Sequence, residues 1–103
     1  MKKMNKPDKV LSYLGLGAKG RNIVSGEFSV EKSVKSGKAF LVIVATDASD
    51  NTKKMFHNMC EFYEVPIAEY GTKDRLGHAI GNEARASIAV LTQGLADGIQ
   101  KVL

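Results

Sequence analysis

The sequence AFLVIVA, residues 39–45, is the longest unbroken apolar run in a chain of 103 residues. Valine and isoleucine prefer extended structure, and the run is far too short to cross a bilayer, which takes about 20 residues. A strand that is apolar on both sides is usually covered on both faces, as in the middle of an α/β sheet. The run therefore predicts a buried central strand over residues 40–45.

Helix-like and strand-like patterns alternate on both sides of this run. In the helix expected after it, the apolar residues that should face inward are Met55, Phe56, Met59, Cys60 and Tyr63. Such alternation implies an α/β fold with helices on both faces of a four-stranded sheet, and no linker or repeat divides the chain, so one domain over residues 1–103 is expected. The predicted helices cover residues 7–20, 25–37, 51–63, 72–81 and the region around 95–102; the predicted strands cover residues 23–24, 40–45, 67–70 and 87–91.

Positive charge is concentrated in the first part of the chain. Residues 1–38 carry nine Lys and Arg against three acidic residues, whereas residues 39–103 carry six against eight. Basic residues gathered on one surface release counterions from a phosphate backbone, so this asymmetry favours a nucleic-acid partner. A generally basic, solvated surface is the alternative. Lys2, Lys3 and Lys6 would add a flexible basic arm over residues 1–6.

The remaining composition is typical of a cytoplasmic protein. No apolar segment of signal-peptide form follows the charged N-terminus, and no run is long enough to span a membrane. Cys60 is the only cysteine, so no internal disulfide can form, which agrees with a reducing compartment. We therefore expect a cytoplasmic protein without a membrane partner.

Three patterns resemble cofactor, metal or catalytic sites but lack what such sites require. GLGAKG, residues 15–20, has the spacing of a dinucleotide-binding loop, yet it follows a helical pattern and no acidic residue lies at residues 35–40. His57 and Cys60 lie three residues apart, but a zinc site needs three or four ligands. Asp47 follows the central strand, where helix capping accounts for it. The sequence thus predicts no catalytic residue, no metal site and no cofactor, and we expect that the protein is not an enzyme.

The segment GEFSVEKSVKSGK, residues 26–38, is the best candidate for a binding surface. A glycine at a helix start allows backbone N–H groups to approach an anion. Lys32 projects from the same predicted helix one to two turns later, and Lys35 one turn further. The segment can therefore cradle a phosphate backbone.

Short motifs along almost the whole chain agree with one known family. These motifs are LGA at residues 16–18, VSG at 24–26, SGKAFLVIVATD at 36–47, VPI at 65–67, LG at 76–77 and ASIAV at 86–90. Over residues 10–103 their order and spacing resemble the kink-turn RNA-binding ribosomal proteins, the archaeal large-subunit "seven-Ae" and eukaryotic "thirty-e" type. The chain is most similar to the short bacterial YlxQ-like branch, which shares the pattern GE-x-x-V-x-K, here Gly26 to Lys32.

This resemblance implies a three-layer α/β/α sandwich with a four-stranded mixed sheet, and RNA binding of a ribosomal or ribosome-associated kind. Family members bind a sharply bent RNA internal loop with the start of the second helix, and cover a splayed-out base with the loop before the last strand. Carried over by position, with Lys35 added from the basic segment, the predicted RNA-binding residues are Gly26, Glu27, Phe28, Ser29, Lys32, Lys35, Asn82, Glu83, Ala84 and Arg85.

The chain departs from the family at the start of the second helix. The usual Asn and Glu, which read guanine edges, are replaced by Phe28 and Ser29. Ser29 can still hydrogen-bond, and Phe28 could stack on a base. In the later loop Arg85 could contact phosphate or stack, whereas Glu83 would repel phosphate.

The main prediction is therefore a monomeric protein that binds structured RNA, such as ribosomal RNA with kink-turn-like loops. The alternative is a protein-interaction module that uses the same fold without RNA. In that case Phe28, if exposed, would anchor the protein partner.

Overall fold

The computed structural model describes residues 8–103, so the predicted basic arm over residues 1–6 lies outside the described part of the chain. The central strand is buried throughout, as its apolar run predicts. The four strands lie in the order β1-β4-β2-β3; β2 pairs parallel with β3, whereas β4 pairs antiparallel with both β1 and β2. The predicted mixed sheet is thus confirmed. Its strands are β1 (Ile23–Ser25), β2 (Leu41–Val44), β3 (Ile67–Glu69) and β4 (Ser87–Val90).

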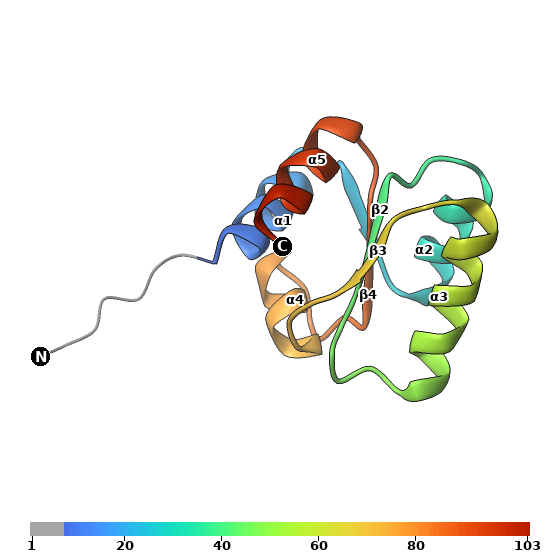
Figure 1. Ribbon diagram of the computed structural model, residues 1–103. Helices are drawn as coiled ribbons and strands as arrows, with labels where there is room; N and C mark the ends of the chain where they lie inside the picture. The colour runs from blue at the N-terminus through green and yellow to red at the C-terminus, as the bar shows by residue number, and fades with distance from the viewer. Residues whose placement is uncertain (1–7) are drawn as a thin grey trace, which may run out of the picture.

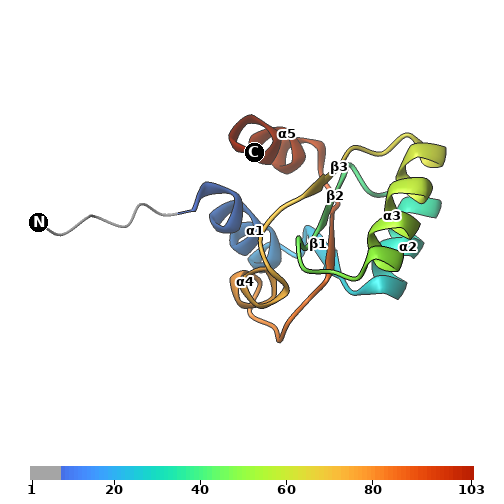
Figure 2. The same ribbon diagram turned by 60° about the horizontal axis from the view of Figure 1, so that its bottom comes forward.

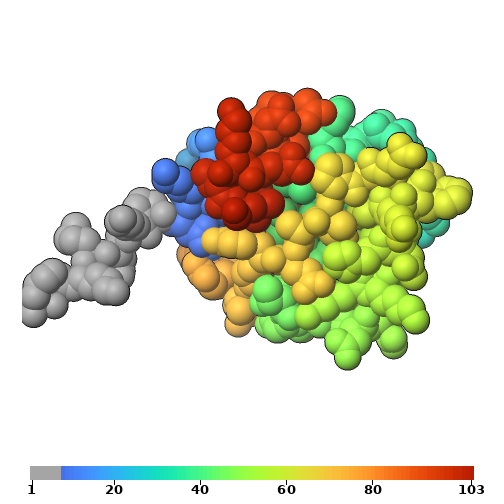
Figure 3. All heavy atoms as spheres, viewed as in Figure 1, coloured from blue at the N-terminus to red at the C-terminus, as the bar shows by residue number. Residues whose placement is uncertain are grey.

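Helices cover both faces of this sheet (Figures 1 and 2). One face carries α1 (Lys9–Lys19), α4 (Lys73–Ala79) and α5 (Gln93–Val102), and the other carries α2 (Glu27–Lys35) and α3 (Asp50–Tyr63). In the space-filling view α5, the β3–α4 segment and α3 form the surface of this side of the molecule (Figure 3). A single core of buried side chains extends from Val10 to Ile99. The predicted α/β/α sandwich is therefore confirmed.

Capping side chains decide where several helices begin. Helix α1 begins at Lys9, later than expected, because Asp8 Oδ1 accepts a hydrogen bond of 3.0 Å from the Leu11 N–H. Asp47 does not cap α3, the helix that follows it in the sequence; its carboxylate accepts a hydrogen bond of 2.8 Å from the N–H of Lys73, the first residue of α4. Ser49 caps the nearer helix α3 instead. Asp47 thus links the end of the central strand β2 to α4, which lies on the other face of the sheet from α3.

The GLGAKG segment, residues 15–20, belongs to α1 and its end, and within the described residues no strand leads into it. A Cβ on Gly17 would lie 2.6 Å from Leu95 Cδ2 and 2.9 Å from Ile23 Cγ2. Glycine is therefore needed so that α1 can approach α5 and β1 closely. The segment serves packing and has no dinucleotide-binding context.

Two residues that the apolar pattern assigns to the interior lie at the surface. Tyr63, expected to face inward from α3, is 40% exposed, and Phe40, expected in the central strand, is 36% exposed and precedes it. Phe40 still donates its N–H to the Val90 carbonyl at 2.8 Å, so its backbone pairs with the end of β4 although its side chain is exposed. Both predictions are wrong because the apolar pattern continues beyond the end of the sheet, where no element covers it.

Candidate nucleic-acid interface

Helix α2 begins without a side-chain cap. Its N-cap residue, Gly26, has φ 94° and ψ 153°, a conformation that residues with a side chain rarely adopt. The N–H groups of residues 27–29 have no acceptor among the described residues and lie at the positive end of the helix. By contrast, the other four described helices are capped by a side chain, from Asp8, Ser49, Thr72 or Thr92.

The loop of residues 82–85, which precedes β4, is folded tightly against α4. A Cβ on Gly77 would lie 1.9 Å from the Glu83 carbonyl oxygen, so only glycine permits this approach. At the other end of the helix, the Arg85 N–H donates to the Lys73 carbonyl at 3.0 Å. The side chains of residues 82–84 are exposed. The backbone of the loop is therefore held against α4 while the side chains of residues 82–84 face solvent.

Two hydrogen bonds bring this loop beside the start of α2. Arg85 Nε donates to Ser25 Oγ at 3.0 Å, and the Gly26 N–H donates to the Ser87 carbonyl at 3.1 Å. Arg85 Nη1 also donates to the carbonyls of residues 83 and 84, at 3.4 and 3.1 Å. The structure thus brings the two predicted surfaces together. It also shows Arg85 positioning the loop, in addition to any contact with a ligand.

A small pocket lies next to this junction, with a volume of about 170 Å³. It combines apolar walls with the hydroxyl of Ser25 and the amide of Asn82. Such a lining suits a flat heterocycle whose edge can form hydrogen bonds. The lining residues are Ala18, Ile23, Val24, Ser25, Ile80 and Asn82.

The two predicted lysines of α2 differ in their surroundings. Lys35 Nζ lies 2.6 Å from Glu31 Oε2, and the hydrogen bond and charge of Glu31 raise the pKa of Lys35. Lys32 is exposed and has no ion-pair partner among residues 8–103. The charge of Lys32 is therefore available to a ligand, whereas that of Lys35 is already compensated.

The arrangement of elements and the loop packing agree with a known family. The model of the ribosomal protein L7Ae/L30e/S12e/Gadd45 family matches residues 8–99. The chain belongs to this family. It is 40% identical over 90 residues to the RNA-binding protein YlxQ of Bacillus subtilis (strain 168), covering 87% of this chain and 90% of that protein. It is 28% identical over 95 residues to the RNA-binding protein YlxQ of Enterococcus faecium, covering 92% and 91%.

Solved structures of similar proteins have the same fold. A protein of unknown function from Bacillus halodurans C superimposes with a TM-score of 0.90 at 36% identity, over 93% of this chain and 97% of that chain. The Giardia lamblia 15.5kD RNA binding protein superimposes with a TM-score of 0.77 at 27% identity, over 99% and 89%. The predicted resemblance to the kink-turn-binding ribosomal proteins and their YlxQ-like branch is confirmed.

In this L7Ae-family chain, two residues that position the interface were not among the predicted site residues. Ser25 accepts a hydrogen bond from the Arg85 guanidinium, and Gly77, which has no side chain, allows the Glu83 backbone to approach α4. Both lie in motifs that carried the family resemblance, VSG and LG. The signal was therefore present in the sequence, but spacing alone does not reveal which loop each residue touches.

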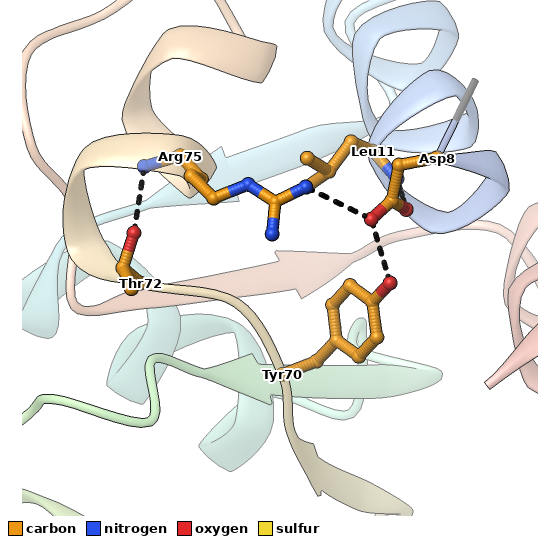
Figure 4. A network of polar contacts seen from close by, with 5 residues as sticks. All are labelled: Asp8, Leu11, Tyr70, Thr72 and Arg75. Carbon is orange, nitrogen blue, oxygen red and sulfur yellow. Dashed lines mark hydrogen bonds and ion pairs between the residues drawn. The ribbon is translucent and has the colours of Figure 1, made fainter. Parts of the chain in front are cut away.

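A second polar network lies behind the interface, between α1, the end of β3 and α4 (Figure 4). Asp8 Oδ2 accepts from Tyr70 Oη at 2.7 Å and from Arg75 Nη2 at 3.2 Å. Burial alone would raise the pKa of Asp8, but the hydrogen bonds from Tyr70 and Leu11 and the charge of Arg75 lower it. The hydrogen bond with Asp8 raises the pKa of Tyr70. The network fixes α4, and with it the loop that follows α4, relative to α1.

The His57–Cys60 pair contributes no metal site in the described part of the chain. Cys60 is fully buried, and this burial raises the pKa of its thiol to about 11. His57 is exposed, and its Nε2 lies 2.9 Å from Glu69 Oε2. Residues 8–103 contain no group of three or more His, Cys, Asp or Glu placed to hold a metal ion, and no helix there has both the length and the apolar character to cross a membrane.

Proposed function

We propose that this protein binds structured RNA and recognises a sharply bent internal loop of the kink-turn kind. The observation that carries this proposal is the junction of the uncapped start of α2 with the 82–85 loop, made by Arg85, Ser25 and Gly26. Two elements held at a fixed spacing can contact both sides of a bend, and RNA loops with distorted backbones are recognised largely by shape. The RNA-binding protein YlxQ of Bacillus subtilis is similar in sequence over 90% of its length, and the Giardia lamblia 15.5kD RNA binding protein shares the fold over 89% of its chain.

The start of α2 is proposed to hold the RNA backbone. The free N–H groups of residues 27–29 and the helix dipole favour a phosphate. Lys32 adds a full positive charge one turn later. Ser29 supplies a hydroxyl that can bond a base edge or a ribose 2′-OH. Lys35, compensated by Glu31, belongs to the margin of this surface.

The 82–85 loop is proposed to cover an unstacked base. Asn82 offers both a donor and an acceptor in the lining of the pocket of about 170 Å³, and the side chain of Ala84 is small and exposed. The exposed carboxylate of Glu83 repels phosphate, so the RNA backbone should pass on the α2 side of the junction. Arg85 holds the loop in place for both contacts.

We also propose that residues 1–103 act as one RNA-binding domain, as a monomer in the cytoplasm, with ribosomal RNA or another stable RNA as the target. One core serves all the described elements, which supports a single domain. The basic residues described in the first part of the chain lie mostly on α1 and α2, on opposite faces of the sheet, so the support for a polyanionic partner comes from α2, where Lys32 is exposed and unpaired among residues 8–103.

The test is a binding titration against a kink-turn RNA and a straight duplex of equal length, each at two salt concentrations. We expect tighter binding to the kink-turn RNA and an affinity that falls steeply with salt. Lys32→Ala should weaken binding. The control, Lys101→Ala, changes an exposed lysine of α5 on the other face of the sheet and should leave affinity unchanged.

Equal, salt-sensitive binding to both RNAs would contradict kink-turn recognition and leave a general RNA binder. Unchanged binding by a folded Lys32→Ala protein would contradict the assignment of the site. Binding to neither RNA would overturn the proposal and direct attention to protein partners.

A further inference from the structure

The outer face of α2 carries a large aromatic side chain in the open. Phe28 is 77% exposed, although it lies in the first turn of the helix, directly after Gly26 and Glu27. No element of the described chain covers this ring. The Phe28 side chain therefore contributes little to the packing of the protein, and a substitution of this residue should leave the fold intact.

Phe28 forms one wall of a shallow groove of about 270 Å³ on this face of α2. Lys32 lies one turn further along, on the same side of the helix, because residues four apart are neighbours on a helix surface. The Glu31–Lys35 ion pair forms the rest of the lining. The groove thus joins an aromatic ring to an available positive charge, while its carboxylate is neutralised by Lys35.

We infer that this groove binds one unpaired nucleotide of the RNA, with its base stacked on Phe28 and its phosphate beside Lys32. The inference rests on the proposed function and extends the RNA-contacting surface from the start of α2 along its outer face. A nucleotide offers what the groove lacks, a flat π-system for the ring and a negative charge for the lysine.

The lining argues against an apolar peptide as the occupant. An apolar side chain placed against Phe28 would also lie against the Glu31–Lys35 ion pair, which lines the same groove. That contact would take the partly exposed ion pair out of water and offer it no new polar partner. The groove also adjoins the uncapped N–H groups of α2, which favour an anion. Charge complementarity therefore selects a nucleotide.

Stacking has a consequence for specificity. Every base has a π-face, so stacking on Phe28 tolerates any base, whereas hydrogen bonds to base edges discriminate between them. The target RNA should accordingly carry an unpaired nucleotide of unrestricted identity next to the bend. Purines should be preferred slightly because they offer a larger stacking surface.

The experiment places iodouridine at each unpaired position of a bound kink-turn RNA in turn and identifies the photo-crosslinked residue by mass spectrometry. We expect one position to crosslink to Phe28. Phe28→Ala should abolish that crosslink and weaken binding about tenfold, and Phe28→Trp should retain affinity. Phe62→Ala is the matched control, since Phe62 is equally exposed, at 78%, but lies on α3 near its end.

The outcomes separate the two proposals. If the unchanged protein binds RNA but Phe28→Ala binds as tightly and no position crosslinks to Phe28, the nucleotide groove is wrong and the proposed function stands. If Phe28→Ala and Phe62→Ala weaken binding equally, the effect is not specific to the groove and the inference also fails. If the unchanged protein binds no RNA, both proposals fall together.

Discussion

The two ends of the sheet differ in how their backbone groups are satisfied. At the end where α2 starts, which we call the open end, Gly26 provides no side-chain cap and the N–H groups of residues 27–29 have no acceptor among the described residues. At the opposite end, the closed end, α2 and α3 finish and the backbone that follows them bonds back to the helices. The Lys38 N–H donates to the Ser33 carbonyl at 2.9 Å, and the Val65 N–H donates to the Cys60 carbonyl at 2.8 Å. Helix N–H groups are therefore open at the start of α2, whereas the backbone groups of Lys38 and Val65 at the other end bond within the chain.

Helix direction reinforces this difference. Helix α2 starts beside Ser87, and α3 follows Val44, which pairs with Ser87 in the sheet. Both helices therefore point their positive ends toward the open end and their negative ends toward the closed end. The closed end instead carries the exposed rings of Phe40 and Tyr63 around a hollow of about 540 Å³. The direction of these two helices therefore agrees with the proposal that phosphate binds at the open end.

The strongest way to disrupt the open end is to displace its loop. Gly77→Ala places a Cβ within 1.9 Å of the Glu83 carbonyl oxygen, a clash with backbone that no side-chain rotation relieves. We expect a loss of about 1–3 kcal/mol in the free energy of unfolding and a loss of more than about tenfold in RNA affinity. Urea denaturation and RNA titration measure the two effects.

Gly94→Ala in α5 is the control for that variant. Nothing lies within 4 Å of a Cβ at Gly94, so the change should stabilise the helix by about 0.5–1 kcal/mol and leave RNA affinity unchanged. A Gly77→Ala protein that kept both stability and affinity would show that the loop does not need this packing.

A pair of glycine variants compares the two ends directly. Gly26 (φ 94°) lies at the open end and Gly37 (φ 76°) at the closed end, and a Cβ would meet nothing within 4 Å at either position. Alanine at either position is strained, by about 1–3 kcal/mol at Gly26 and about 1–2 kcal/mol at Gly37. Both variants should lower the melting temperature, but only Gly26→Ala should weaken RNA binding severalfold. Equal loss of RNA affinity in the two variants would contradict the assignment of the open end.

The two lysines of α2 allow a finer comparison along one helix. Lys32→Gln removes an available charge, so the slope of log affinity against log salt should decrease by about one. Lys35→Gln removes a charge already compensated by Glu31 and should change the slope less. Titrations at four or more salt concentrations measure both slopes. A larger change for Lys35→Gln would move the RNA path toward the closed end.

The smallest effect is expected from protonation of Asp8. Protonation weakens the contacts that hold α4 against α1, but it does not alter the proposed RNA-binding surface itself. The pKa of Asp8 in the folded protein lies below its ordinary value of 3.8, so its contribution to stability is full above that pH and is lost as pH falls through the folded pKa. Asp8→Asn should therefore lower the melting temperature at pH 7, and the difference from the unchanged protein should shrink below about pH 4. Thermal melts across pH 2–7 measure this difference. A constant difference at all pH values would mean that the Asp8 charge is not involved.

Much of the fold follows from local patterns. The apolar run at residues 39–45 predicts the buried β2 because a strand without a polar face needs cover on both sides. Thr72 marks the start of α4 because its side chain satisfies a free N–H of the first turn. The same patterns misplace Phe40 and Tyr63, because periodicity does not reveal where the sheet ends and burial stops.

Only part of the candidate site could be predicted from the sequence. Gly26 and Lys32 stand out in the sequence, since a glycine before a basic helix has a local physical meaning. The roles of Ser25, Gly77 and Arg85 do not, because each depends on a partner that the chain brings close only by folding.

The identity of the elements and the capping of α1, α3, α4 and α5 by the residue directly before each helix are properties of neighbouring residues, and the amino-acid sequence determines them directly. The junction of α2 with the 82–85 loop is different. Ser25 and Arg85 are 60 residues apart, and Asp47 reaches Lys73 across 26 residues. The first contact exists because β1 pairs with β4, and the second because β2 pairs with β3, the strand that leads into α4. Only the packed sheet decides which free backbone groups and which loop share one surface, and that surface is where RNA is proposed to bind.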